Sequence, residues 1–247
     1  YSDYRLAALV CSASAFLAAL IVLIFVQPNA MKPLSKAQKL RHPLDLRPAF
    51  RKPVALGYII AYGMHTYELF AYRTWSFALL IFLASRAEEP FGIGAVTIII
   101  SIITVTGLLA SLIGAKICLF FGRHRVIALI GAASVLTSFF AAVSLDGPIW
   151  IAIVGLWTYN IFIMLDSGAL TTGTVEAGDD HDRGALLAVH SMIGFGGGAL
   201  GGPVIGYVLD QRGGSNSIDA WFYAVLGMGV GSAIVFLVQR YFWQRNY

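Results

Sequence analysis

Charged residues are scarce in this sequence. Of its 247 residues, 12% are Asp, Glu, Lys or Arg, whereas 58% are hydrophobic. A soluble domain carries about 25% charged residues, so the composition excludes an ordinary soluble protein and predicts an integral membrane protein. The net charge of +4 arises in the loops, which in a membrane protein indicates orientation and gives no reason to expect a nucleic-acid partner.

Cysteines and catalytic motifs are equally scarce. The two cysteines, Cys11 and Cys118, are too few and too far apart for a disulfide framework or a metal cluster. No GxSG run occurs, residues 65–69 read HTYEL and not HExxH, and no nucleophile and base stand at a recognisable spacing. The acidic turn 176–183 is interpreted as solvated. We therefore expect no enzymatic activity, no cofactor and no metal.

Seven apolar stretches are each long enough to cross a bilayer. We therefore predict an all-α, polytopic membrane protein with seven transmembrane helices. It would consist of a helix over 1–27, a basic loop over 28–54 and a six-helix bundle over 55–247. A retinal protein is excluded because every lysine lies in a loop or at the edge of a span. The predicted spans are 5–27, 55–84, 94–120, 125–145, 148–173, 184–209 and 219–240.

The basic residues predict the orientation. Most of the 17 lysines and arginines lie in the loop 28–54, between Lys116 and Arg125, at Arg183 or at the end of the chain. By the positive-inside rule these segments and the C-terminus are cytoplasmic. Because the chain begins at Tyr1 without a methionine, we also expect it to be a piece of a longer protein.

The second span carries ionisable residues at His65, Glu68 and Arg73. A charged group near the bilayer centre costs ~2.5–3.5 kcal/mol, so such residues normally face a protein interior or a water-filled cavity. His65, Glu68 and Tyr72 share one helical face, while Arg73 points away and is expected to pair with another helix. The segment predicts either a polar pathway or an ion-pair network that only locks helices together.

The fifth span carries Tyr159, Asn160 and Asp166. A carboxylate at this depth needs a partner or water. Asp166 is therefore interpreted as a proton-titrating site or as the partner of Arg73 or His190, and helix packing is weighed equally.

Glycine recurs at every fourth position of the sixth span, where it leaves one side of the helix nearly bare. Small residues at this spacing let another helix approach closely, and Pro203 predicts a kink. The pattern indicates either a moving interface or static tight packing. The stripe consists of Gly194, Gly198, Gly202 and Gly206, with Gly196, Gly197 and Gly201 beside it.

Three features together resemble the C-terminal half of a major facilitator superfamily transporter. They are the basic loop after one apolar helix, the turn Gly122-Arg123-His124-Arg125, and the run Gly198-x-x-x-Gly202-Pro203-x-x-Gly206. The family's turn motif, G-x-L-A-D-R-x-G-R-R, maps onto residues 115–124 and keeps Gly122 and Arg123. Its acidic and basic pair falls on Leu119 and Phe120, so the charge latch associated with that motif is not expected here.

The resemblance implies a major-facilitator-like six-helix bundle preceded by one helix, with the N-terminal half missing. It implies that the second and fifth spans line a central cavity and that the third and sixth form the rocking interface. The packing and gating elements are then the glycine stripe with Pro203 and the turn with Gly122, Arg123 and Arg125.

We therefore predict a secondary active transporter of a small solute in the lipid bilayer, expected in a bacterial inner membrane. It would work by alternating access with protons, or another ion, as the coupling ion. The alternative is a non-transporting membrane sensor or assembly subunit on the same scaffold. The substrate-binding candidates are Arg73, Tyr72, Trp75, Tyr159 and Asn160, and the proton-coupling candidates are Glu68, His65, Asp166 and His190.

Overall fold

The computed structural model describes residues 4–26 and 45–245, and the chain divides into two compact units, 1–42 and 43–247. The described part of the first unit is one helix, α1 (Tyr4–Phe25), whose 22 residues are all exposed. It is apolar and about 33 Å long at 1.5 Å per residue, which suits a bilayer. Residues 28–44 of the predicted loop lie outside the described residues.

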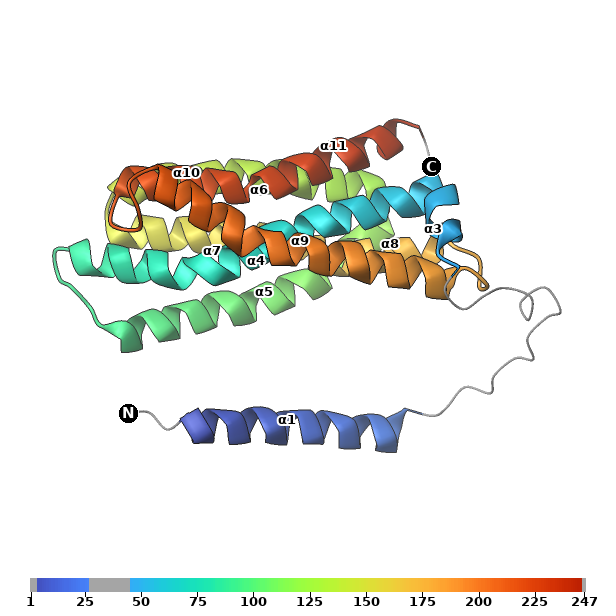
Figure 1. Cartoon of the computed structure of the whole chain (residues 1–247), viewed down its shortest axis with the longest axis horizontal. Helices are drawn as coiled ribbons and strands as arrows, with labels where there is room; N and C mark the ends of the chain where they lie inside the picture. The colour runs from blue at the N-terminus through green and yellow to red at the C-terminus, as the bar shows by residue number, and fades with distance from the viewer. Residues whose placement is uncertain (1–3, 27–44, 246–247) are drawn as a thin grey trace. The chain divides into compact units, whose positions relative to one another are not determined.

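The second unit is helical, and no strand occurs among the described residues (Figure 1). It begins with a single turn, α3, in the described remainder of the predicted loop. Its helices are α3 (Arg47–Arg51), α4 (Pro53–Arg86), α5 (Ile93–Phe121), α6 (Arg123–Val143), the 3-10 turn η1 (Ser144–Asp146), α7 (Ile149–Leu165), α8 (Ser167–Glu176), α9 (Arg183–Gln211), α10 (Ile218–Met228) and α11 (Val230–Gln244).

Six helical segments among the described residues are long and apolar enough to cross a membrane: 4–25, 93–121, 123–146, 149–176, 183–211 and 218–244. The remaining predicted span, the second (55–84), corresponds to α4, which has 34 residues but is not among the six. This helix carries His65, Glu68 and Arg73, which make it more polar than its neighbours. The fold is an all-α, polytopic membrane fold, as the sequence predicted.

Two predicted spans are interrupted in the structure. The fifth divides into α7 and α8 at Asp166, and the last divides into α10 and α11 at Gly229. Both interruptions are local: the N–H of Leu170 donates to the carbonyl of Asp166 at 3.0 Å, and that of Ala233 donates to Gly229 at 3.1 Å. An apolar run predicts the length of a helix but carries no signal for a break of one residue.

Helix α4 has packing partners along most of its length. It contacts α9 most extensively and also packs on α11, α8 and α7. Tyr72, Tyr159 and Trp221 are buried in the largest apolar core, which surrounds the middle and one end of α4. The helix that carries His65, Glu68 and Arg73 is therefore enclosed on several sides by the bundle.

Candidate functional site

Glu68 is the centre of a polar cluster inside the bundle. The side chain is 1% exposed. Its Oε1 accepts hydrogen bonds from the hydroxyls of Tyr159, at 2.7 Å, and Ser134, at 3.3 Å, and its Oε2 accepts one from Ser232. These donors come from α7, α6 and α11, all of which meet at Glu68 on α4. We call Glu68, Ser134, Tyr159 and Ser232 the Glu68 cluster.

The cluster stabilises a carboxylate without a directly bound cation among the described residues. Hydrogen bonds to charged groups contribute about 1.5–3 kcal/mol each, so two or three of them are enough to offset the ~2.5–3.5 kcal/mol cost of a charge in the membrane. Burial opposes the charged form and the hydroxyl donors favour it. Burial and hydrogen bonding therefore act in opposite directions on the charge of Glu68.

A second ionisable pair lies one helical turn from Glu68. His65 Nδ1 is 2.8 Å from Asp166 Oδ1, and both side chains are buried. Asp166 caps the junction between α7 and α8, so the break in the fifth span places its carboxylate against α4. The sequence expectation that Asp166 pairs with Arg73 or His190 is wrong, because its partner is His65.

His190 continues this line of polar groups on α9. Its ring stacks on Tyr62 with centroids 3.7 Å apart, and Tyr62 in turn faces His65 at 6.0 Å. The Thr174 hydroxyl, which is hydrogen-bonded to the carbonyl of Leu170, is also hydrogen-bonded to His190 Nδ1 at 3.0 Å, and the Thr171 hydroxyl lies 3.3 Å from His190 Nε2. Two of the four proton-coupling candidates, Glu68 and His65, are thus on α4, and the other two, Asp166 and His190, lie against residues of that helix.

Arg73 lies on a different face of α4. It is exposed, and it makes no hydrogen bond or ion pair with another described residue. It is five positions from Glu68, which places the two side chains about 140° apart around the helix. The helix partner expected for Arg73 is therefore not found in the described part of the chain, and its guanidinium faces outward from this unit.

The other substrate-binding candidates use their polar groups inside the bundle. Tyr72 donates to the carbonyl of Leu156 at 2.9 Å, and Trp75 donates its indole N–H to Gly202 at 2.8 Å. Asn160 donates to the carbonyl of Ile103 at 2.9 Å, linking α7 to α5. Tyr159 belongs to the Glu68 cluster. Of the five substrate-binding candidates, Arg73 is the one that is exposed and whose side chain makes no hydrogen bond with another described residue.

The glycines of α9 are packed against α4. A Cβ at Gly197 or Gly201 would overlap the backbone carbonyl of Gly63 or Tyr67, so the two backbones are in direct contact. This confirms the close helix approach that the glycine spacing predicted. Pro203 lies within α9, which continues through it. The stripe Gly194, Gly198, Gly202 and Gly206 faces Tyr62, Phe70, Thr74 and Trp75.

The turn between α5 and α6 carries Gly122, Arg123 and Arg125. Gly122 has φ +89°, a left-handed conformation that favours glycine and allows α6 to start at the next residue. Arg123 Nη1 is 2.7 Å from Glu176 Oε2 at the end of α8, and Arg125 lies over the ring of Trp243 at 5.7 Å. An ion pair therefore joins the start of α6 to the end of α8 at this turn.

A further ion pair joins the segment before α4 to the loop between α8 and α9. Lys52 Nζ is 2.6 Å from Asp179 Oδ2 and 3.0 Å from Asp182 Oδ2. Hydrogen bonds to these two carboxylates raise the pKa of the Lys52 ammonium above its ordinary value. The turn expected to be simply solvated thus ties two segments together.

Sequence reasoning missed two members of the Glu68 cluster, Ser134 and Ser232. Ser134 is one of several serines and threonines in the fourth span, and Ser232 is the one serine of the last. Their only signal is that a hydroxyl in a membrane helix often bonds to a neighbouring helix. Which acceptor each serine binds depends on which helices are adjacent, and neither composition nor spacing predicts that adjacency.

Comparison with known proteins relates this arrangement to a transporter fold. No protein-family model matches the sequence, and a comparison with curated proteins finds no match. Among solved structures, the Escherichia coli fucose:proton symporter FucP is similar, with a TM-score of 0.70 and 16% sequence identity. The match covers 98% of this chain and 58% of the symporter chain. The chain therefore shares the fold of this symporter, over a length that corresponds to little more than half of that structure.

Proposed function

We propose that this chain is the C-terminal half of a secondary active transporter that moves a small solute by alternating access and is driven by protons. The observation that carries the proposal is the Glu68 cluster. It is a carboxyl group within a membrane helix, held by hydroxyls from three other helices. The fold it stands in is similar to that of a protein described as a fucose:proton symporter.

Glu68 is suited to bind and release a proton because its neighbours are hydroxyls and not cations. An arginine or lysine in contact would hold it permanently charged, whereas hydroxyls can donate to a carboxylate or accept from a carboxylic acid. Loss of a proton from Glu68 strengthens its bonds to α6, α7 and α11, and gain of a proton weakens them. Protonation thereby changes how α4 is attached to the bundle.

The His65–Asp166 pair and His190 extend from Glu68 toward the junction of α8 and α9. His65 stands one turn from Glu68, and Tyr62 separates His65 from His190. Histidine exchanges protons near neutral pH more readily than any other side chain. We propose that this line carries the proton between Glu68 and the cytoplasmic side, with Asp166 holding His65 in position.

The solute binds on the other face of α4, at Arg73. This guanidinium is exposed and unpaired within the described chain, and it suits an anionic or polar solute through paired hydrogen bonds. The proton and the solute would therefore occupy opposite sides of one helix. Movement of α4 relative to its neighbours couples the two, and the missing N-terminal half supplies the other wall of the solute cavity.

The α4–α9 contact and the turn at Gly122 are proposed as the elements that govern this movement. Gly197 and Gly201 bring α9 against the α4 backbone, so α4 and α9 shift together. The Arg123–Glu176 pair holds the ends of α6 and α8 in one of the two states. In this proposal the protein lies in a bacterial inner membrane with the loop 28–54 and the C-terminus cytoplasmic, following the positive-inside rule.

The test is proton-gradient-driven flux of a panel of metabolites and drugs in inside-out vesicles that contain the full-length parent protein. We expect Glu68→Gln to lose gradient-driven flux but keep solute exchange, because the amide cannot carry a proton. Arg73→Ala is expected to lose both. Glu89→Gln, in an exposed part of the α4–α5 loop, is the matched control and should transport normally.

Two outcomes would redirect the proposal. If Glu68→Gln keeps gradient-driven flux while Asp166→Asn loses it, the proton site is the His65–Asp166 pair. If ligands bind but no compound moves in any folded variant, the protein is a membrane sensor or an assembly subunit.

A further inference from the structure

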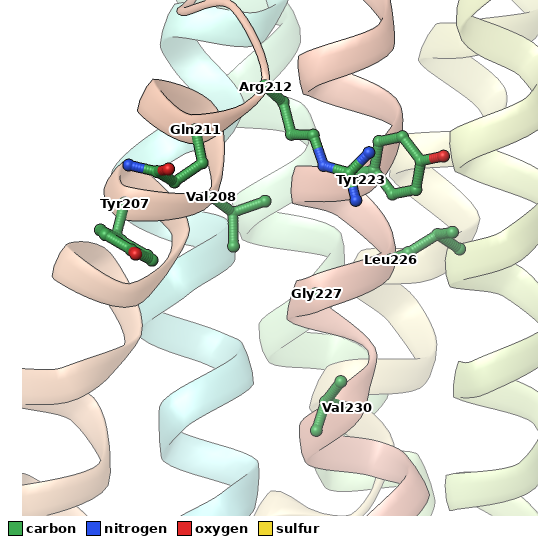
Figure 2. A pocket seen from close by; sticks show the side chains of 8 residues that line it. All are labelled: Tyr207, Val208, Gln211, Arg212, Tyr223, Leu226, Gly227 and Val230. Carbon is green, nitrogen blue, oxygen red and sulfur yellow. The ribbon is translucent and has the colours of Figure 1, made fainter.

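A groove lies between the end of α9 and the α10–α11 helix pair. Its volume is about 380 Å³. Figure 2 shows the side chain of Arg212 reaching toward Tyr223 at the upper end, with apolar side chains lower down the groove. The lining residues are Tyr207, Val208, Gln211, Arg212, Tyr223, Leu226, Gly227 and Val230.

The polar end of the groove is positively charged. The Arg212 guanidinium lies over the Tyr223 ring with its carbon 3.8 Å from the ring centroid. Stacking on an aromatic face fixes the guanidinium plane and leaves its N–H donors at the edge available. Arg212 makes no ion pair with another described residue, and none of the eight lining residues carries a carboxylate. This end of the groove therefore offers hydrogen-bond donors to an anion.

The rest of the groove is apolar and runs into the membrane. Arg212 follows α9 directly, at the end of a membrane-spanning segment. Val208 lies one turn before Arg212 on α9, and Leu226 and Val230 lie one and two turns beyond Tyr223. From Tyr223 to Val230 the groove extends about 10 Å along the helix axis. A cation at the membrane surface followed by an apolar channel matches a molecule with an anionic head and a hydrocarbon chain.

The wall of the groove is fixed to the bundle. The hydroxyl of Tyr67 on α4 donates to the carbonyl of Gly227 at 3.2 Å. Gly227 lines the groove, and a Cβ on it would come within 3.1 Å of Ile205 on α9. Because Gly227 has no side chain, α10 can approach α9 at this point, and the groove opens above the contact. The groove is a built feature of the helix packing and not a gap between mobile ends.

We propose that this groove is a binding site for an anionic phospholipid. The phosphate binds the Arg212 guanidinium, and an acyl chain lies along Val208, Leu226 and Val230. A second protein chain is a poorer match because only one cation and no acidic group would contact it. The site lies at the end of the bundle where α9 meets α10, opposite the end of α11 (Figure 1), and in the proposed orientation this end faces the outer leaflet.

The test is native mass spectrometry of the full-length parent protein, titrated with phosphatidylglycerol or phosphatidylethanolamine of identical acyl chains. Wild type is expected to bind the first phosphatidylglycerol about fivefold more tightly, since one basic residue near an anionic surface contributes about that factor. Arg212→Gln should remove this preference. Val230→Trp, which fills the exposed lower part of the groove, should weaken binding of both lipids.

Arg86→Gln is the matched control. Arg86 ends α4 and lies over the Phe82 ring at 5.3 Å, but it does not line the groove. It should leave the lipid preference unchanged. The proposal is overturned if both arginine variants reduce the preference equally, if Val230→Trp binds as wild type does, or if glycerol phosphate without acyl chains competes as well as the lipid. Circular dichroism of each variant confirms that the helices are intact.

Discussion

The contact between the α4 and α9 backbones makes a sharp stability prediction for Gly201→Ala. A Cβ at Gly201 would overlap the carbonyl oxygen of Tyr67 and come within 2.8 Å of the Ala71 nitrogen. Both obstacles are backbone atoms, so no side chain can rotate away and the helices must separate. The same substitution at Gly196 meets nothing within 4 Å.

Both substitutions gain helix propensity, but only Gly201→Ala also overpacks the contact between α4 and α9. Alanine in place of glycine favours a helix by up to about 1 kcal/mol. Overpacking a well-filled interface costs about 1–3 kcal/mol, and Gly201→Ala should fall at the upper end because backbone must move. We expect a net loss of about 2 kcal/mol for Gly201→Ala and no loss for Gly196→Ala.

The assay is thermal unfolding of the full-length parent in detergent, with a thiol-reactive fluorophore and a Cys11→Ser background. Cys118 is buried whereas Cys11 is exposed, so the remaining thiol of this chain reports opening of the bundle. A loss of about 2 kcal/mol lowers Tm by about 4–8 °C in a chain of 150–250 residues and by less in a longer one, so Gly201→Ala should lower the Tm of the parent by a few degrees. A Tm equal to or above that of Gly196→Ala would refute the packing argument.

Two further predictions concern the polar contacts of α4 and the segment before it. Tyr159→Phe removes a donor to the Glu68 carboxylate and should lower Tm more than Tyr72→Phe, because bonds to a charged acceptor contribute about 1.5–3 kcal/mol against about 1 for a neutral one. Equal losses at pH 8 would show that Glu68 is uncharged there. Lys52→Met should destabilise the protein at pH 8. The pKa of Lys52 is higher in the folded protein than in the unfolded chain, where it is near 10.4, so the ion pairs of Lys52 stabilise the fold fully at any pH below about 10.4. The difference from wild type should vanish as pH rises through the folded-state pKa; a pH-independent difference would instead indicate lost packing of the lysine side chain.

The membrane class and the helices could be predicted from the sequence because they depend on local composition. A bilayer requires about 20 apolar residues for each spanning helix, and the predicted spans differ from the observed helices mainly at their ends and at Asp166 and Gly229. The sequence also predicted that His65, Glu68 and Asp166 need polar partners, since ionisable residues in apolar runs are costly, and the structure shows all three buried beside polar groups. The close approach of α9 to another helix followed from its glycine spacing.

The partners of these residues depend on the tertiary structure. The sequence places Ser134, Tyr159 and Ser232 on three separate spans, and only the packing of those spans around α4 directs all three hydroxyls to Glu68. The same packing pairs Asp166 with His65 and leaves Arg73 exposed. Composition and spacing determine whether a segment enters the membrane, because each helix satisfies its own backbone hydrogen bonds. Which polar side chains meet there is decided by contacts between helices far apart in the chain.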